Sequence, residues 1–189
     1  MADRISALAG HYRKGFHGPR GVVGVKMQDM VGLEMHQIAA WPDTINDVGA
    51  IAAESAGASA APGPRQAAVG SNGTLLRIEP LKWWLFGAVA PELDPESGNT
   101  LDVSHSRTHL RITGPDASEF LNRHVSLDLR DESFSVGSVG STVIHHVGVT
   151  LWRSDNGYEL FLPRGFALTL WEGFVESAAQ FGLEVVPAG

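Results

Sequence analysis

The chain has 189 residues, 43% of them hydrophobic and 19% charged, a composition typical of a soluble globular protein. Lys and Arg number 14 against 21 Asp and Glu, so the net charge of −7 argues against nucleic acid and anionic membranes as partners. The absence of cysteine excludes disulfides, a thiolate nucleophile and cysteine-ligated metal sites. No run approaches about 18 apolar residues and no signal peptide is visible, so we predict a cytoplasmic protein.

The first 20 residues are basic and aromatic, with Tyr12, Arg13, Phe16 and Arg20 close together. They show no helical or strand periodicity long enough to bury these side chains within their own domain. Tyr, Phe and Arg are residue types that protein interfaces favour. We therefore predict that residues 1–20 form an N-terminal arm that docks on a larger partner chain.

Residues 21–98 are predicted to form the first half of a compact unit. After Trp41-Pro42, Asp43 or Thr44 can cap a helix that ends by Gly57, with apolar positions spaced three and seven apart. The Ala-, Gly-, Ser- and Pro-rich stretch 55–73 is expected to be a loop. Strand patterns occur at 22–27, 33–38, 75–78 and 83–86.

Residues 99–189 are predicted to form the second half, after an acidic, Pro-containing boundary. A short helix follows Thr113-Gly114-Pro115-Asp116, and Asp155-Asn156-Gly157 marks a hairpin turn. The clearest element is a last helix, whose apolar positions from Ala167 to Phe181 follow helical spacing. Strand patterns occur at 101–105, 109–113, 142–152, 158–162 and 183–186. The fold class is α+β, with two pseudo-repeated strand–helix–strand halves and antiparallel sheets, packed as one compact unit.

Histidines offer the first candidates for a metal site. His145 and His146 are neighbours in a predicted strand, so they point to opposite faces and cannot share one metal without a bulge. His105 and His109 lie across a predicted turn and could form a His-His-Asp set with Asp102. Capping and turn hydrogen bonds explain Asp102 and His105 more simply, so we assign no metal ligand and no catalytic residue.

Two other patterns have simpler explanations than a catalytic or cofactor site. Ser104-His105 lies near Asp102, but the Gly-x-Ser-x-Gly turn of a nucleophilic hydrolase is absent. The adjacent Trp83 and Trp84 alternate faces in a strand, so one indole is expected in the core and the other at a surface. Because Trp is enriched at interfaces, we favour an interface over cofactor stacking for the second ring.

The second half carries a family resemblance in Asp102-Val103-Ser104-His105, Thr113-Gly114-Pro115-Asp116-Ala117, Phe120-Leu121-Asn122-Arg123 and Asp128-Leu129. It resembles the folate-binding aminomethyltransferase superfamily. Within that superfamily, the segments at 148–153, 158–164, 166–168, 170–172 and 181–185 are similar to the gamma-subunit family of heterotetrameric sarcosine oxidases.

The resemblance implies a subunit of a complex that oxidises sarcosine to glycine, releases hydrogen peroxide and passes the one-carbon unit to tetrahydrofolate. It implies alpha, beta and delta subunits as partners. FAD, FMN, NAD, zinc and tetrahydrofolate are expected on those partners, and no cofactor is expected in this chain.

The sequence departs from the enzymes of the superfamily in two places. Those enzymes place an aspartate after the Asp-Leu motif, whereas this chain has no Asp between Asp131 and Asp155. Their folate-contacting segment Gly-Glu-x-Gly-Tyr-Glu survives only as Gly157-Tyr158-Glu159. Tyr158 and Glu159 are thus the weak candidates for cofactor binding, and a strand carboxylate that faces solvent is the simpler reading of Glu159.

These departures favour a non-catalytic subunit over the main alternative, a free-standing folate-dependent aminomethyltransferase or demethylase. Without the aspartate, no carboxylate stands ready in that region to stabilise an iminium-like cation. Related proteins of RNA modification and iron–sulfur maintenance would be expected to carry a cysteine motif, which this chain lacks.

Overall fold

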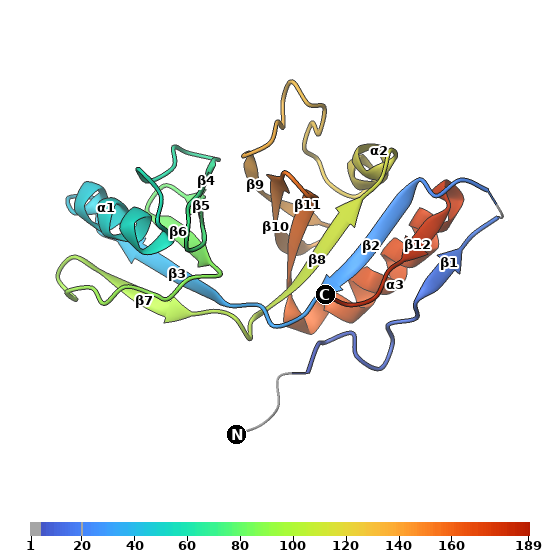
Figure 1. The fold of residues 1–189 in the computed structure, drawn as a ribbon, viewed down its shortest axis with the longest axis horizontal. Coiled ribbons are helices and arrows are strands. Elements are labelled where there is room, and N and C mark those ends of the chain that lie inside the picture. Colours follow the sequence, from blue (N-terminus) through green and yellow to red (C-terminus); the bar gives the residue numbers. More distant parts are fainter. Residues whose placement is uncertain (1–4, 20) are drawn as a thin grey trace. The chain divides into compact units, whose positions relative to one another are not determined.

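The structure is a computed structural model that describes residues 5–19 and 21–189. Its chain divides into two compact units, and Figure 1 shows their elements. Unit 1 comprises Met1–Gly32, Ser106–Val136 and Ser141–Gly189. Unit 2 comprises Leu33–His105 and Gly137–Gly140. Unit 2 is therefore inserted into the chain of unit 1.

Unit 1 is built on a seven-stranded sheet with the order β1-β12-β2-β8-β11-β10-β9. β12 runs parallel to β2, whereas β1 with β12, β2 with β8, β8 with β11 and β11 with β10 are antiparallel. The strands are β1 (Gly15–His17), β2 (Val25–Met30), β8 (Arg107–Thr113), β9 (Val139–Ile144), β10 (Val147–Ser154), β11 (Gly157–Pro163) and β12 (Leu183–Val185).

Two helices pack against the sheet of unit 1, the short α2 (Ala117–Asn122) and the longer α3 (Ala167–Ala178). The buried face of α3 carries Leu170, Trp171, Phe174 and Ala178, at the helical spacing read from the sequence. These side chains share one core with apolar residues of the central strands: Val25, Met27, Leu110, Ile112, Leu160 and Leu162. Two short 3₁₀ turns, η1 (Arg164–Phe166) and η2 (Ala179–Phe181), flank α3.

Unit 2 is a five-stranded sheet, with the order β4-β5-β6-β3-β7, and one helix. The helix α1 (Ile45–Ala56) buries Val48 and Ala52 against Ile38, Leu75 and Trp83 of the sheet. It ends at Gly57, whose φ of 68° lies in the left-handed region that favours glycine. The strands are β3 (Met35–Ala40), β4 (Ala67–Val69), β5 (Thr74–Glu79), β6 (Lys82–Phe86) and β7 (Gly98–Asp102).

This architecture confirms the predicted α+β class with mainly antiparallel sheets and few helices. The helix that ends by Gly57, the hairpin between β10 and β11 and the last long helix all form as expected. In the part of the chain that the structure describes, no helix has the length and apolar character needed to cross a bilayer.

One predicted strand is wrong, because the run 142–152 is not continuous. His145 and His146 form the turn between β9 and β10, and His145 adopts a φ of 54°. A positive φ is uncommon for a residue other than glycine, so these two histidines give no turn signal in the sequence.

The N-terminal segment differs from the expected free arm over its described residues, 5–19. Leu8 is fully buried in the core of unit 1, and the Tyr12 ring stacks on Trp171 with 5.1 Å between centroids. Farther along, β1 pairs with β12. The segment is therefore part of unit 1. Residues 1–4 and Arg20 of the expected arm lie outside the described residues.

The chain also divides differently from the expected halves at 21–98 and 99–189. The strand patterns at 22–27 and 33–38 both fall in the expected first half, but β2 pairs with β8 and β12 in unit 1. β3 pairs with β6 and β7 in unit 2. Sequence neighbours were separated because each strand completes a sheet with partners far away along the chain.

Candidate functional site

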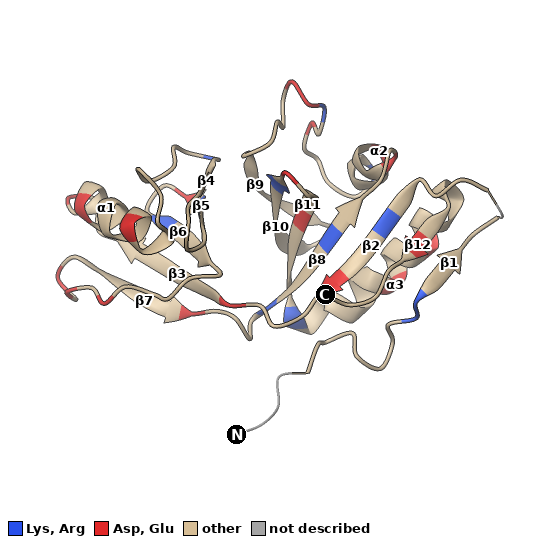
Figure 2. Cartoon of the chain, viewed as in Figure 1, with Lys and Arg blue, Asp and Glu red and all other residues tan. Residues whose placement is uncertain are grey.

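A buried polar cluster on the sheet of unit 1 is centred on Glu159 of β11. In the antiparallel pairing of β11 with β8, Glu159 lies opposite Arg111, and Phe161 lies opposite His109. Residues two apart in a strand share a face, so His109, Arg111 and Glu159 are brought together on one side of the sheet. In Figure 2 an acidic position on β11 accordingly lies beside a basic position on β8.

The carboxylate of Glu159 accepts hydrogen bonds on both oxygens. His109 Nε2 donates to Oε2 at 2.6 Å, because a carboxylate at this position can only accept. Arg111 Nε and the Ser154 hydroxyl donate to Oε1, each at 2.8 Å. Ser154 in turn accepts from the backbone N–H of Asn156, which ties the cluster to the β10–β11 turn.

The cluster is almost closed to solvent. Glu159 is 0% exposed and His109 2% exposed, and the His109 ring stacks on Phe161 at 4.7 Å. Burial raises the pKa of the Glu159 carboxyl, but the hydrogen bond and charge of His109 and the hydrogen bonds from Ser154 and Arg111 outweigh burial. The net effect holds the pKa of Glu159 below its usual range, so the side chain is an ionised, fully engaged acceptor.

The expectation that Glu159 faces solvent is therefore wrong. A carboxylate with three protein donors and no exposed surface is arranged to join β8, β10 and β11. It offers no open position to a ligand.

Tyr158, the second weak candidate, lies on the opposite face of β11. Its ring is 2% exposed within the core of unit 1, and its hydroxyl donates to the Leu129 carbonyl at 3.2 Å. The guanidinium of Arg153 lies over the ring, 4.3 Å from its centroid. Tyr158 and Glu159 thus point to different faces and do not form one site.

The remaining histidine candidates do not assemble into a metal site. His109 is held by Glu159, whereas His105 is exposed. Asp102 Oδ1 accepts from the backbone N–H of Ser104 at 2.9 Å, which confirms the simpler turn explanation for this aspartate. Among the described residues, no group of three or more His, Cys, Asp or Glu side chains could hold a metal ion.

Ser104 and the tryptophan pair also have structural surroundings. The Ser104 hydroxyl accepts from the Met35 backbone N–H at 2.9 Å and can donate to the Met35 carbonyl, so it joins β3 to the end of β7. Trp83 is 1% exposed and Trp84 3% exposed, so the expectation of one exposed indole is wrong. β6 lies between β5 and β3, and both faces of this interior strand are covered.

Sequence reasoning missed three members of the cluster: His109 as the partner of Glu159, Arg111 and Ser154. The signal for Ser154 was present, since it lies at the hairpin five residues before Glu159. His109 and Arg111 are separated from Glu159 by 50 and 48 residues, and only the strand register brings them together.

The sequence matches one known protein family over more than half of its length. The model of the GCVT N-terminal domain matches residues 83–189, more than half of the chain. The chain belongs to the GCVT N-terminal domain family. The match spans β6 to the C-terminus and includes the whole Glu159 cluster.

The chain is also similar to individual curated proteins. The chain is 32% identical over 91 residues to sarcosine oxidase subunit gamma of Arthrobacter sp., covering 48% of this chain and 45% of that protein. It is 31% identical over 93 residues to an aminomethyltransferase of Thermoanaerobacter sp. (strain X514), covering 47% of this chain and 24% of that protein. The matched part thus spans about half the length of the first relative and a quarter of the second.

The fold has a close counterpart among solved structures. A chain of the heterotetrameric sarcosine oxidase from Corynebacterium sp. U-96 superposes with a TM-score of 0.77 at 20% identity, covering 94% of this chain and 96% of that one. This likeness establishes that the two chains share one fold over nearly their whole length. An aminomethyltransferase of the glycine cleavage system from Bartonella henselae shares the fold with a TM-score of 0.57 at 16% identity, covering 88% of this chain and 48% of that one.

The residues of this chain do not fit tetrahydrofolate. Of the folate-contacting segment, Glu159 is the carboxylate that remains, and His109, Arg111 and Ser154 already occupy its oxygens. In place of the missing aspartate, β9, its turn and β10 present mainly apolar and histidine side chains.

Proposed function

We propose that this chain is the non-catalytic gamma subunit of a cytoplasmic sarcosine oxidase complex. The complex would demethylate sarcosine oxidatively to glycine, transfer the one-carbon unit to tetrahydrofolate and release hydrogen peroxide. Alpha, beta and delta subunits would be the partners. FAD, FMN, NAD, zinc and tetrahydrofolate would be bound by those subunits.

The proposal rests on the hydrogen bonds that Glu159 accepts from neighbouring strands of its own sheet. The fold of the family is kept, but the carboxylate is ionised, buried and bonded to three donors of the same sheet. Similarity to the gamma subunit of Arthrobacter sp. supports the same assignment.

The alternative function is a free-standing folate-dependent aminomethyltransferase or demethylase. The similarity to aminomethyltransferases such as that of Thermoanaerobacter sp. supports this alternative. It requires a carboxylate that reaches the substrate, which Glu159 cannot supply while His109 and Arg111 hold it.

The test is a comparison of the chain alone with the chain co-expressed with the flavoprotein and zinc-binding subunits. Alone, it should show no flavin absorbance, no stoichiometric zinc, no sarcosine-dependent peroxide release and no saturable heat on titration with tetrahydrofolate. Co-expressed, it should purify with an active complex. Micromolar folate affinity of the isolated chain that disappears in Glu159→Gln would establish the alternative instead.

A further inference from the structure

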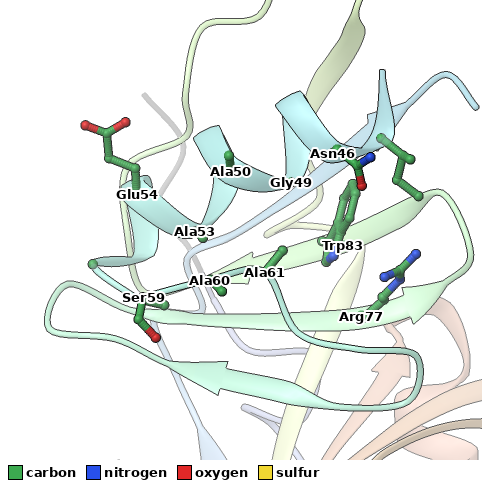
Figure 3. Close-up of a pocket in the computed structure, with 13 residues that line it drawn as sticks. Asn46, Gly49, Ala50, Ala53, Glu54, Ser59, Ala60, Ala61, Arg77 and Trp83 are labelled. Carbon is green, nitrogen blue, oxygen red and sulfur yellow. The ribbon is translucent and has the colours of Figure 1, made fainter. Parts of the chain in front are cut away.

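Unit 2 contains a groove that the proposed function does not use. It lies between α1, the segment that follows α1, and strands β5 and β6 (Figure 3). Its volume of about 710 Å³ is within the range of small-molecule sites. Its lining includes the small residues Gly49, Ala53 and Ala61, whose side chains are too short to fill the groove.

The positively charged side chain of Arg77 lies at one end of this groove. The guanidinium of Arg77 donates from Nη2 to the Pro80 carbonyl at 2.7 Å and from Nη1 to the Pro62 carbonyl at 3.4 Å. Among the described residues no carboxylate forms an ion pair with Arg77, and the neighbouring Glu79 pairs with Lys82 instead. A half-buried cation with only carbonyl partners keeps unused donors and an uncompensated charge.

A buried aromatic side chain lies beside this cation. Trp83 is 1% exposed and lines the groove, and the Arg77 guanidinium lies 5.4 Å from the centroid of its ring. At this end of the groove, the buried donors Trp83 Nε1 and Arg77 Nε have no acceptor within the described residues. Buried donors without acceptors cost free energy, so the protein alone does not satisfy this end of the groove.

The surrounding charges favour an anion. The first residues of α1, Ile45 and Asn46, line the same end, and the N-terminus of a helix carries partial positive charge. The acidic lining residue Glu54 belongs to the last turns of α1 and points away from the groove in Figure 3. Asp47 of the first turn is exposed and does not line the groove.

We propose that this groove binds a small organic carboxylate, whose carboxylate pairs with Arg77 and whose apolar body lies against the alanines, above the buried Trp83. The planar guanidinium suits a carboxylate because it can donate two parallel hydrogen bonds. The site is separate from the Glu159 cluster, since its lining residues belong to unit 2.

The test is a titration of the ¹⁵N-labelled full chain with benzoate, followed by the indole N–H signals of its five tryptophans. Trp83→Phe identifies the signal of Trp83. Benzoate should shift this signal saturably, whereas the neutral analogue benzamide should not. Arg77→Gln should weaken benzoate binding roughly tenfold, and Arg77→Lys should weaken it less because the charge remains.

The matched control is Arg65→Gln, which removes an exposed cation of the same unit that does not line the groove. It should leave benzoate binding unchanged. The absence of a saturable benzoate shift, equal shifts with benzamide, or equal losses in Arg77→Gln and Arg65→Gln would each overturn the proposal. A shift caused only by added partner subunits would assign the groove to a protein interface and would also overturn it.

Discussion

Replacement of Glu159 by alanine tests the role of the buried cluster. The substitution removes an acceptor of three hydrogen bonds and leaves His109, which is 2% exposed, and Arg111 without their anion. Loss of one partner from a buried ion pair costs roughly 3–5 kcal/mol. The side chain of Arg111 is 26% exposed and can turn toward water, so we expect the lower end, about 3 kcal/mol.

The assay is urea unfolding of the full chain, followed by tryptophan fluorescence. The matched control is Glu184→Ala, which breaks the ion pair of Glu184 with Lys26 on the same sheet. The side chains of that pair are 37% and 48% exposed, and the loss of such a surface pair should cost less than about 1 kcal/mol.

The reasoning is refuted if the two variants lose the same free energy of unfolding. Glu159 would then contribute no more than a surface carboxylate, despite its burial. A stable Glu159→Ala variant that also loses folate binding would show that the cluster serves a ligand rather than the sheet.

Two further predictions follow from the same unit. Leu8→Ala should lower the free energy of unfolding by about 3 kcal/mol because Leu8 is fully buried, whereas Ile5→Ala, at a side chain that is 62% exposed, should change it little. Equally small changes in the free energy of unfolding for the two variants would contradict the burial of Leu8 and would favour a free arm. The lowered pKa of Glu159 contributes stability that is present above the unfolded value of about 4.3 and is lost as pH falls through the folded value. Unfolding measured across a pH series should therefore show a smaller loss of stability below about pH 4 in Glu159→Gln than in the native chain, and identical slopes would contradict the cause given for the shift.

The features predicted well from the sequence are those encoded locally. The helices α1 and α3 follow from apolar positions spaced by helical turns, and Gly57 marks the end of α1 at a left-handed position. The β10–β11 hairpin follows from Asp155-Asn156-Gly157, a turn signal between two β-branched and aromatic runs. Each of these depends on residues within one short window.

The features predicted badly depend on distant pairing. Leu8 and Tyr12 have too short a pattern to predict burial, and their place is set by α3, about 160 residues away along the chain. Glu159 reads as a strand carboxylate that faces solvent, until register places Arg111 and His109 on the same face. The family resemblance identified the fold and the aspartate that this chain lacks. It could not show that the remaining glutamate, Glu159, accepts hydrogen bonds from His109, Arg111 and Ser154.

The insertion of unit 2 into the chain of unit 1 has a consequence for the order of folding during synthesis. Most of unit 2 emerges as the continuous stretch Leu33–His105 and can begin to fold once Gly137–Gly140 has joined it. The sheet of unit 1 is completed later. Its strand β12 lies between β1 and β2, and β12 is synthesised last whereas β1 and β2 are synthesised first. Until β12 arrives, β2 keeps an unpaired edge, the kind of surface on which other chains can add strands. A nascent chain stalled before Leu183 should therefore be the form of this protein most prone to aggregation.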